Sequence, residues 1–376
     1  MLRLLTEEGH RVRVVPTKDA LRFVGEATWA GLSGEPVTTD VWTGVQDAPH
    51  VRLGKEADLV LVVPATADLL ARAAHGRADD LLTATLLMAT CPIVYAPAMH
   101  TEMWQHPATT ANVRTLRERG ALVIEPASGR LAGHDSGPGR LPDPDEIAAI
   151  ASRILSGGKA HKNDLAGRKI TISAGGTREE IDPVRFIGNW SSGRQGYAFA
   201  RAAVARGAEV TLIAANVSLP DPAGAKVIKV TSALDLRAAM NIDADAIVMA
   251  AAVADYRPAE RNPAKLKKDG QTPAPLRLRE NPDILAGLAR ARGEGRRPIL
   301  VGFAAETDPT PDQARDKLDR KGCDLLVVNP VGGGRAFGTD DNEAVIYARD
   351  GSETPVPRGP KDVLADIVLD LIAADL

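Results

Sequence analysis

Short apolar runs alternate with helix-like patterns along most of the chain. In the first half, the predicted strands are residues 10–16, 57–64, 91–97 and 121–126. In the second half they are residues 169–176, 208–215, 245–254, 298–306, 324–330 and 344–350, followed by an amphipathic helix from Lys361. Strands that alternate with helices are typical of parallel sheets with crossover helices. The pattern therefore predicts an α/β protein with mostly parallel sheets.

The alternation is interrupted twice. Residues 156–168 are small, polar and aperiodic, which predicts a linker between a first domain, residues 1–155, and a second domain, residues 169–376. Residues 257–280 are rich in proline and lysine and have no apolar period. A loop of that length inside a compact domain is usually functional or mobile.

Composition narrows the class of protein. The 376 residues are 44% hydrophobic and 25% charged with a net charge of −3, which is ordinary for two globular domains and offers no footprint for nucleic acid. The two cysteines, Cys91 and Cys323, argue for a reducing compartment and hence a cytoplasmic protein. The uncharged stretch 81–99 contains Pro92 and Pro97, so we read it as a helix, a turn and a strand rather than a membrane span.

Two small-residue turns stand close together at the start of the second domain. Gly175 and Gly176 end an apolar strand, and Ser191, Ser192 and Gly193 precede a helix. Such turns let backbone amides approach an anion, and a helix N-terminus adds partial positive charge. An ordinary strand-to-helix turn would explain Gly-Gly alone equally well.

The wider stretch is more specific. AGGTRE, DPVR and NWSSG, within residues 174–193, resemble the ligase half of the bifunctional coenzyme A biosynthesis proteins. Further motifs of that family follow in order: AAVADY with the loop PAKLKK, NPDI, GFAAET, a helix with Lys317 and Lys321, and GTDDNEA at 338–344. An exposed lysine pair or lysine run most often faces solvent. Here the order and register of the matches favour a nucleotide site.

The resemblance implies roles for these residues. Asn189 would handle the acyl intermediate and Lys265, on a loop with Lys267 and Lys268, would assist acyl transfer. The remaining CTP or phosphopantothenate contacts would come from the residues Gly175, Gly176, Ser191, Ser192, Gly193, Asp255, Asn281, Pro282, Asp283, Ile284, Phe303, Lys317 and Lys321. The reaction implied is CTP-dependent condensation of 4′-phosphopantothenate with L-cysteine through an acyl-cytidylate, with Mg²⁺ accompanying CTP. No set of metal ligands is evident in the sequence.

The first half carries a second constellation. His50 lies in a predicted loop, and histidine suits proton transfer near neutral pH, although a lone loop histidine is usually a surface residue. The HVRL, PATADL and PAMHTEMW segments resemble the flavin-dependent cysteine decarboxylases. The resemblance implies that His50 is catalytic, that Pro64, Ala65, Thr66 and Asp68 bind FMN, and that Pro97, Ala98, Met99 and His100 bind phosphopantothenoylcysteine.

This half departs from the family pattern in three places. Asp68 and His100 stand where asparagine is usual, and Gly133 stands where the family has a flap cysteine, so the proton donor is open. The usual first strand and glycine-rich turn are also missing before Met1. We therefore expect either a natural start upstream of Met1 or weak FMN binding.

The sequence leaves more than one function open. The first interpretation is a bifunctional enzyme with two Rossmann-like or flavodoxin-like domains, the first lacking its usual first strand. The alternative is a ligase whose N-terminal half is an inactive, oligomerising, flavin-binding scaffold. An NAD(P) oxidoreductase is disfavoured because neither half has GxGxxG after a strand with an acidic residue about twenty positions later. The family resemblance also implies a homo-oligomer.

Overall fold

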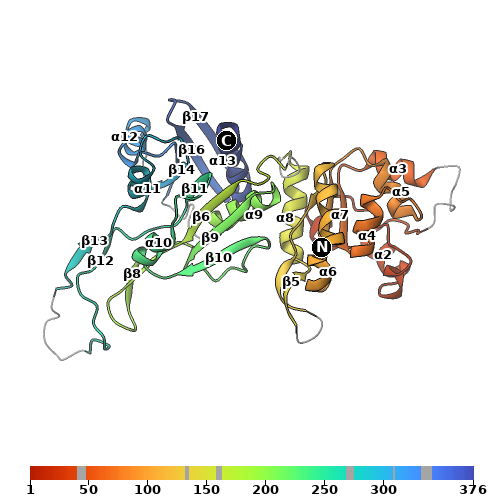
Figure 1. The fold of residues 1–376 in the computed structure, drawn as a ribbon, viewed down its shortest axis with the longest axis horizontal. Coiled ribbons are helices and arrows are strands. Elements are labelled where there is room, and N and C mark those ends of the chain that lie inside the picture. Colours follow the sequence, from red (N-terminus) through yellow and green to blue (C-terminus); the bar gives the residue numbers. More distant parts are fainter. Residues whose placement is uncertain (40–47, 132–134, 158–162, 268–274, 308–309, 332–340) are drawn as a thin grey trace. The chain divides into compact units, whose positions relative to one another are not determined.

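The protein consists of two compact units, residues Met1–Asn163 and Asp164–Leu376. The structure is a computed structural model that describes residues 1–39, 48–131, 135–157, 163–267, 275–307, 310–331 and 341–376 (Figure 1). Each unit is an α/β structure with a central sheet that is wholly or mostly parallel, which confirms the predicted fold class.

The first unit is built around a three-stranded parallel sheet in the order β1-β2-β3. Its strands are β1 (Val60–Ala65), β2 (Ile93–Pro97) and β3 (Leu122–Val123), and a separate antiparallel hairpin joins β4 (Ala127–Arg130) to β5 (Ser136–Arg140). Its helices are α1 (Leu2–Glu7), η1 (Ala20–Arg22), α2 (Glu26–Ser33), α3 (Pro49–Glu56), α4 (Ala67–Ala74), α5 (Leu81–Met88), α6 (Thr101–Gln105), α7 (Pro107–Glu118) and α8 (Pro144–Leu155). One face of the sheet is covered by apolar side chains of α4, α5 and α7, among them Leu70, Leu86 and Val113.

Two expectations for this unit were wrong. Residues 10–16, predicted as a strand, have no regular structure, and among the described residues of this unit the parallel sheet is formed by β1, β2 and β3. An alternating apolar pattern does not provide the neighbouring backbone that a strand needs for its hydrogen bonds. His50, predicted in a loop, lies in the first turn of α3, because Pro49 is well suited to the first position of a helix.

The second unit contains an eight-stranded sheet in the order β10-β9-β6-β11-β14-β15-β16-β17. Its strands are β6 (Lys169–Gly175), β9 (Glu209–Ala215), β10 (Ala225–Val230), β11 (Ala246–Met249), β14 (Ile299–Glu306), β15 (Leu325–Pro330), β16 (Asp341–Ala348) and β17 (Glu353–Pro360). Its helices are α9 (Arg194–Ala205), α10 (Ala233–Ala239), α11 (Ile284–Arg292), α12 (Pro311–Lys321) and α13 (Lys361–Asp375). The strands from β10 to β15 are parallel, whereas β16 and β17 run antiparallel at one end.

Helices cover both faces of this sheet. Apolar residues of α9 and α13, such as Phe199 and Leu369, pack on one face with Ile172 and Leu212. Apolar residues of α10, α11 and α12 pack on the other face with Ile247 and Leu300. Because both faces are buried, the central strands are almost continuously apolar, which is why the sequence shows them clearly.

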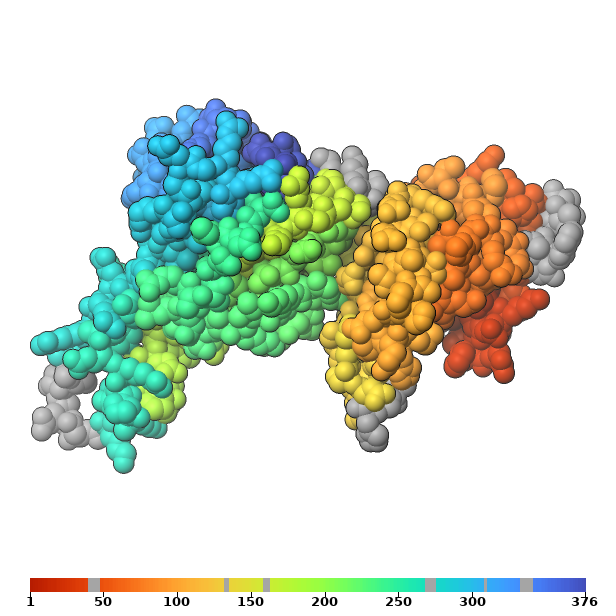
Figure 2. Space-filling view, viewed as in Figure 1, coloured from red at the N-terminus to blue at the C-terminus, as the bar shows by residue number. Residues whose placement is uncertain are grey.

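Four short strands form an arm that stands out from the body of this unit (Figures 1 and 2). They are β7 (Arg178–Glu180) paired with β8 (Phe186–Gly188), and β12 (Tyr256–Pro258) paired with β13 (Leu278–Glu280). The predicted irregular loop 257–280 therefore has a strand at each end, and its residues 268–274, including Lys268, lie outside the described part of the chain.

Candidate functional site

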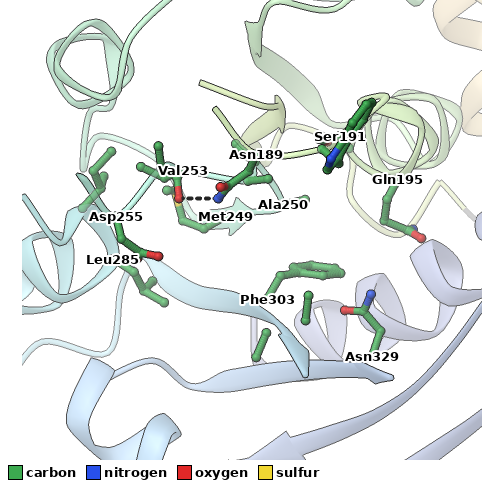
Figure 3. Close-up of a pocket in the computed structure, with 18 of the residues that line it drawn as sticks. Asn189, Ser191, Gln195, Met249, Ala250, Val253, Asp255, Leu285, Phe303 and Asn329 are labelled. Carbon is green, nitrogen blue, oxygen red and sulfur yellow. Dashed lines mark hydrogen bonds between the residues drawn. The ribbon is translucent and has the colours of Figure 1, made fainter. Parts of the chain in front are cut away.

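A cavity of about 820 Å³ lies in the second unit, where β11, β14 and β15 end (Figure 3). Ligands bind at the carboxyl ends of strands in open α/β sheets. Most of the residues predicted for the ligase site line this cavity: Asn189, Ser191, Ser192, Gly193, Asp255, Asn281, Pro282, Asp283, Ile284, Phe303, Lys317 and Lys321. Three helix N-termini, those of α9, α11 and α13, contribute residues to its wall.

The small-residue turn before α9 forms one wall. Gly193 is the N-cap of α9 and has φ of +79°, and the hydroxyl of Ser191 accepts a 3.4 Å hydrogen bond from its N–H group. A Cβ on Gly193 would lie 2.6 Å from a methyl carbon of Val217. Glycine is therefore required here both by the backbone conformation and by space. The first residues of α9 line the cavity, so a helix N-terminus lies at its wall, as an anion site needs.

The other glycine pair does not line the cavity but supports it. Gly175 has φ of +86°, and its carbonyl accepts a 2.8 Å hydrogen bond from the N–H of Ala252. A Cβ on Gly176 would lie 2.7 Å from the carbonyl oxygen of Asn189. Gly176 thus lets the segment that carries Asn189 lie directly against the end of β6, whereas Gly175 allows the close approach of Ala215 at the end of β9.

Asn189 and Asp255 stand on neighbouring segments of the wall. The Asn189 amide donates a 3.0 Å hydrogen bond to the carbonyl oxygen of Val253 (Figure 3). The side chain of Asn281 donates to the Ala254 carbonyl at 2.8 Å, and its N–H donates to the Asp255 carbonyl at 2.7 Å. Asn281 therefore holds the backbone of Asp255 in place, while the Asp255 carboxylate faces the cavity.

Two ion pairs form the basic side of the cavity. Lys317 Nζ lies 2.7 Å from Glu306 Oε1, and Lys321 Nζ lies 2.6 Å from Asp283 Oδ2. Burial alone would raise the pKa of Asp283, but the hydrogen bonds from Lys321 and from the Ala286 N–H hold that pKa below its ordinary value. Lys317 and Lys321 lie one helical turn apart on α12. Phosphate oxygens of a bound polyphosphate can replace the two carboxylates as partners of these ammonium groups.

Phe303 provides an apolar surface within this polar cavity. Its ring packs edge-on against the buried ring of Phe199, with centroids 5.7 Å apart and planes at 86°. Such edge-to-face packing restrains both rings. Phe303 is therefore held in a defined position beside the polar groups.

Lys265 does not line the cavity. The neighbouring residue, Leu266, is held in the arm: its N–H donates to a carboxylate oxygen of Asp182 at 3.2 Å, and its carbonyl accepts from Arg185 at 2.9 Å. Asp182 is buried, and its hydrogen bonds from the Arg185 guanidinium and from backbone amides hold its pKa far below the ordinary value. The arm thus anchors the chain next to Lys265.

Sequence reasoning missed several residues of the cavity. Gln195, Asn329, Asn342 and Lys361 all line it, and they come from four separate elements. Asn342 falls in the sequence motif GTDDNEA, which by itself assigns no role to its individual polar groups. Residues 338–340 of that motif lie outside the described part. No local pattern marks Lys361, because it reaches the cavity only through the position of α13.

In the first unit, the two predicted turns lie at the same edge of the sheet. Ala65, at the end of β1, pairs with Pro97, at the end of β2, and the Ala98 N–H donates to the Ala65 carbonyl at 3.2 Å. Pro64 belongs to β1, and the Thr66 hydroxyl caps α4 by accepting from the Leu69 N–H at 3.2 Å. The turns after β1 and β2 are therefore brought together by the parallel pairing.

The polar side chains of these turns point in different directions. Asp68 is exposed and forms a 3.0 Å ion pair with Arg72, one turn further along α4. His100 is exposed at the start of α6, beside Met99. The Met99 N–H donates to the Gly139 carbonyl at 3.0 Å, so the β4–β5 hairpin lies on this segment. Gly133, the predicted flap position, lies outside the described residues.

His50 is only partly exposed. Its Nδ1 atom is buried and has no hydrogen-bond partner among the described residues. Helix α3 packs closely on α5, since a Cβ on Gly54 would lie 2.7 Å from the Cβ of Met88. The histidine is thus held by a tightly packed helix.

The described residues show neither a cluster of metal ligands nor a membrane-spanning helix. They contain no group of three or more His, Cys, Asp or Glu side chains arranged to hold a metal ion. No helix in the described part is both long and apolar enough to cross a membrane.

Comparison with known proteins covers both units. The family model "DNA/pantothenate metabolism flavoprotein C-terminal domain" matches residues 165–376, and the model "Flavoprotein" matches residues 1–155. The Coenzyme A biosynthesis bifunctional protein CoaBC of Mycobacterium tuberculosis is 58% identical over 100% of this chain and 93% of its own length. The protein of the same name from Escherichia coli is 40% identical over 99% of this chain and 92% of its own length.

Solved structures also resemble parts of this chain. The C-terminal domain of a Coenzyme A biosynthesis bifunctional protein CoaBC is 34% identical and aligns with a TM-score of 0.47 over 56% of this chain and 97% of that chain. The two family models and the full-length relatives agree with the motifs found in each half. The chain belongs to the family of bifunctional coenzyme A biosynthesis proteins, enzymes that combine a phosphopantothenate–cysteine ligase with a flavin-dependent phosphopantothenoylcysteine decarboxylase.

Proposed function

We propose that the cavity of the second unit binds CTP and 4′-phosphopantothenate and forms an acyl-cytidylate, which L-cysteine then attacks. The single observation that carries this proposal is the convergence of the Ser191–Gly193 turn, Asn189, Asp255 and the two α12 lysines on one cavity. These groups come from segments far apart in the sequence. Together they offer amide donors, cations and a carboxylate, which are the groups that a nucleoside triphosphate needs.

The proposed chemistry is acyl activation. A carboxylate oxygen of phosphopantothenate attacks the α-phosphorus of CTP, the bond to pyrophosphate breaks, and the acyl-cytidylate forms. The amine of cysteine then attacks the acyl carbon and releases CMP. Negative charge gathers on the phosphate oxygens during the first step, and fixed cations and preorganised amides stabilise such charge. Mg²⁺ would enter with the triphosphate, whose oxygens are its ordinary ligands.

The residues have separate roles in this proposal. Lys317 and Lys321 exchange their carboxylate partners, Glu306 and Asp283, for phosphate oxygens. Asp255 recognises the nucleotide, and Asn281 holds the backbone of Asp255 in position. These assignments agree with the hydrogen bonds that already hold Asn281 in place.

Three further assignments complete the ligase site. Asn189 and the N–H groups at the start of α9 orient the acyl phosphate, and Phe303 borders the base. Lys265 acts from the loop next to the anchored Leu266 and adds positive charge during acyl transfer. Gly176 acts indirectly, through the position of Asn189, and Gly175 acts through the close packing of Ala215 beside it.

We also propose that the first unit decarboxylates phosphopantothenoylcysteine with FMN. The residues fit the cofactor in one respect: the turns after β1 and β2 meet at one edge of a parallel sheet, where α4 begins. Pro64, Ala65, Thr66 and Asp68 would hold FMN, and Pro97, Ala98, Met99 and His100 the substrate. Bound FMN supplies two-electron redox chemistry. His50 would move a proton at its imidazole, and the β4–β5 hairpin would exclude water.

The remaining proposals concern organisation. We assign the decarboxylase to residues 1–155, a linker to 156–168 and the ligase to 169–376. We further propose a homo-oligomer and, from the cysteine usage, a cytoplasmic location. The alternative, a ligase with an inactive N-terminal scaffold, predicts no CO₂ release from phosphopantothenoylcysteine.

One experiment tests the ligase proposal directly. Pyrophosphate release is measured with CTP, and phosphopantothenate, cysteine and Mg²⁺ are omitted one at a time. The proposal requires that release depends on CTP, phosphopantothenate and Mg²⁺. Release of pyrophosphate without phosphopantothenate, or no release at all, would contradict it.

A further inference from the structure

The side chain of Gln195, the second residue of α9, connects three elements at the wall of the cavity. Its Nε2 group donates a 3.0 Å hydrogen bond to the carbonyl oxygen of Lys361, the first residue of α13. Its Oε1 atom accepts a 3.0 Å hydrogen bond from Nδ2 of Asn342, in β16. In Figure 3 the side chain of Gln195 extends from its helix toward the cavity. One amide thus joins α9 to both α13 and β16.

One further contact closes these bonds into a ring, and another fixes the side chain of Asn342. The Lys361 ammonium donates a 2.6 Å hydrogen bond to the carbonyl oxygen of Asp341, the residue before Asn342. The Oδ1 atom of Asn342 accepts a 3.0 Å hydrogen bond from the N–H of Glu343. Asn342 and Lys361 are each only 7% exposed, so these bonds are shielded from water. Shielded hydrogen bonds are costly to leave unmade.

The ring determines how both side-chain amides are oriented. The Lys361 carbonyl can only accept, so the NH₂ group of Gln195 must face it. The carbonyl oxygen of Gln195 then faces Asn342, whose own orientation is set by the Glu343 N–H. Turning either amide over would bring two acceptors or two donors together. The ring therefore has a single arrangement that satisfies every group.

We propose that Gln195 and Asn342 are positioning residues for the ligase reaction, which hold the first turn of α9 in register with the substrate phosphates. This inference rests on the proposed nucleotide site and adds residues to it. The first turn of α9 follows Gly193 and packs through Gly196 on β6, where an added Cβ would lie 2.5 Å from the Cβ of Ala174. This packing holds the turn on the sheet, and the ring adds polar links that tie its cavity side to α13 and β16.

Helix α13 is a firm anchor for this purpose. Its residues Leu364, Ala365, Val368, Leu369 and Ile372 are buried in the core of the unit. Reacting groups in an active site must stay within much less than about 1 Å of their productive positions. A link from the phosphate-facing turn to this buried helix would help to keep the turn within that tolerance.

The test is to compare binding of CTP and CMP by titration calorimetry in the full chain. The variants are Gln195→Met, which keeps the length of the side chain, Asn342→Ala, and the double variant. Each single change should weaken CTP binding about tenfold, as expected for the loss of one or two positioning hydrogen bonds, and change CMP binding less than about twofold. The double variant should bind CTP no more weakly than the single variant of lower CTP affinity, because both changes break the same ring.

A matched control is available on the same two helices. Arg201, in α9, forms a 3.2 Å ion pair with Asp362, in α13, and neither residue lines the cavity. Arg201→Ala should lower the melting temperature without changing the ratio of CTP to CMP affinity. If Asn342→Ala fails to fold, Asn342→Asp replaces it, since a carboxylate cannot donate to Gln195. Decarboxylase activity of each preparation reports whether the remainder of the chain is intact.

Several outcomes would overturn the inference. Gln195→Met could bind CTP like the wild type, CTP and CMP affinities could fall together, or the effects of the two single changes could multiply in the double variant. Multiplication would mean that the two side chains act separately, each on the substrate. Absence of CTP binding by the wild type would instead contradict the proposed nucleotide site itself.

Discussion

The ammonium of Lys321, at the end of α12, lies 2.6 Å from a carboxylate oxygen of Asp283, the N-cap of α11. This ion pair joins two helices at the wall of the cavity. It engages the ammonium group of Lys321, which the proposed reaction needs to bind the triphosphate. Triphosphate binding would exchange one anionic partner for another, so the ammonium keeps a charged partner throughout. The same cavity position therefore serves stability before binding and charge neutralisation after it.

Replacing this lysine should weaken CTP binding specifically. We expect Lys321→Met to raise the KM for CTP about tenfold, the size of one lost charge-assisted hydrogen bond, and to leave the KM for cysteine nearly unchanged. Steady-state pyrophosphate release measures both constants. Arg320→Met is the matched control, because it removes one positive charge from an exposed position of the same helix. Equal effects of the two changes would show that only the overall charge of α12 matters.

The ion pair should also make stability depend on pH. The folded-state pKa of Asp283 is lowered, so the pair contributes stability above the unfolded pKa of about 3.9 and loses it as the pH falls through the lower folded value. Because the Asp283 side chain is 41% exposed, we expect less than about 1 kcal/mol.

Urea unfolding at several pH values tests this dependence. Asp283→Asn keeps an N-cap acceptor but lacks the titrating group. The wild type should therefore lose more stability than Asp283→Asn between about pH 6 and about pH 3. Asp319→Asn, on the exposed face of α12, serves as the control. Parallel curves for the wild type and Asp283→Asn would contradict the prediction.

Release of the arm should slow the reaction. Asp182→Ala removes the acceptor that holds the Leu266 N–H and the Arg185 guanidinium, and so frees the chain next to Lys265. We expect the ligase kcat to fall about tenfold with little change in the KM for CTP, because orientation is lost rather than binding. Arg261→Ala breaks an exposed ion pair with Glu180 on the same arm and should have a smaller effect. A rise in KM alone would argue against the proposed role of Lys265.

Close packing beneath Asn189 makes Gly176 sensitive to substitution. A Cβ there would lie 2.7 Å from the Asn189 carbonyl oxygen, so backbone must shift in Gly176→Ala. We expect a loss of about 1–3 kcal/mol in stability and a larger relative loss of ligase activity. Gly287→Ala, inside α11, meets only Arg290 at 3.9 Å and should stabilise the chain by about 0.5–1 kcal/mol. Chemical unfolding and pyrophosphate release measure the two effects. Normal ligase activity of Gly176→Ala would contradict the proposal that Gly176 supports the position of Asn189.

In the first unit, Gly139 allows the hairpin to lie on the substrate segment. A Cβ there would lie 2.2 Å from the Met99 carbonyl oxygen, so Gly139→Ala should displace the β4–β5 hairpin. We expect decarboxylation to fall at least about tenfold while ligase activity of the same protein is retained. CO₂ release and pyrophosphate release give the two rates. Gly31→Ala, where no atom lies within 4 Å, is the control and should leave both rates unchanged.

The sequence by itself determined the class of fold and most of the cavity wall. Buried parallel strands are continuous apolar runs, and turn residues such as Gly193 are required by local backbone conformation, so both leave a local signal. The motifs around Asn189, Asp255 and Lys317 lie at the ends of those strands or on a capped helix. Their convergence followed from the rule that parallel strands end at one edge.

Only the tertiary structure decided the remainder. The alternation at residues 10–16 predicted a strand, but a strand also requires a partner, which local sequence does not specify. Lys361 and Gln195 are 166 positions apart and meet because α9 and α13 pack on the same face of the sheet. Contacts of this kind depend on how whole elements pack, so they cannot be predicted from residue type or from spacing along the chain.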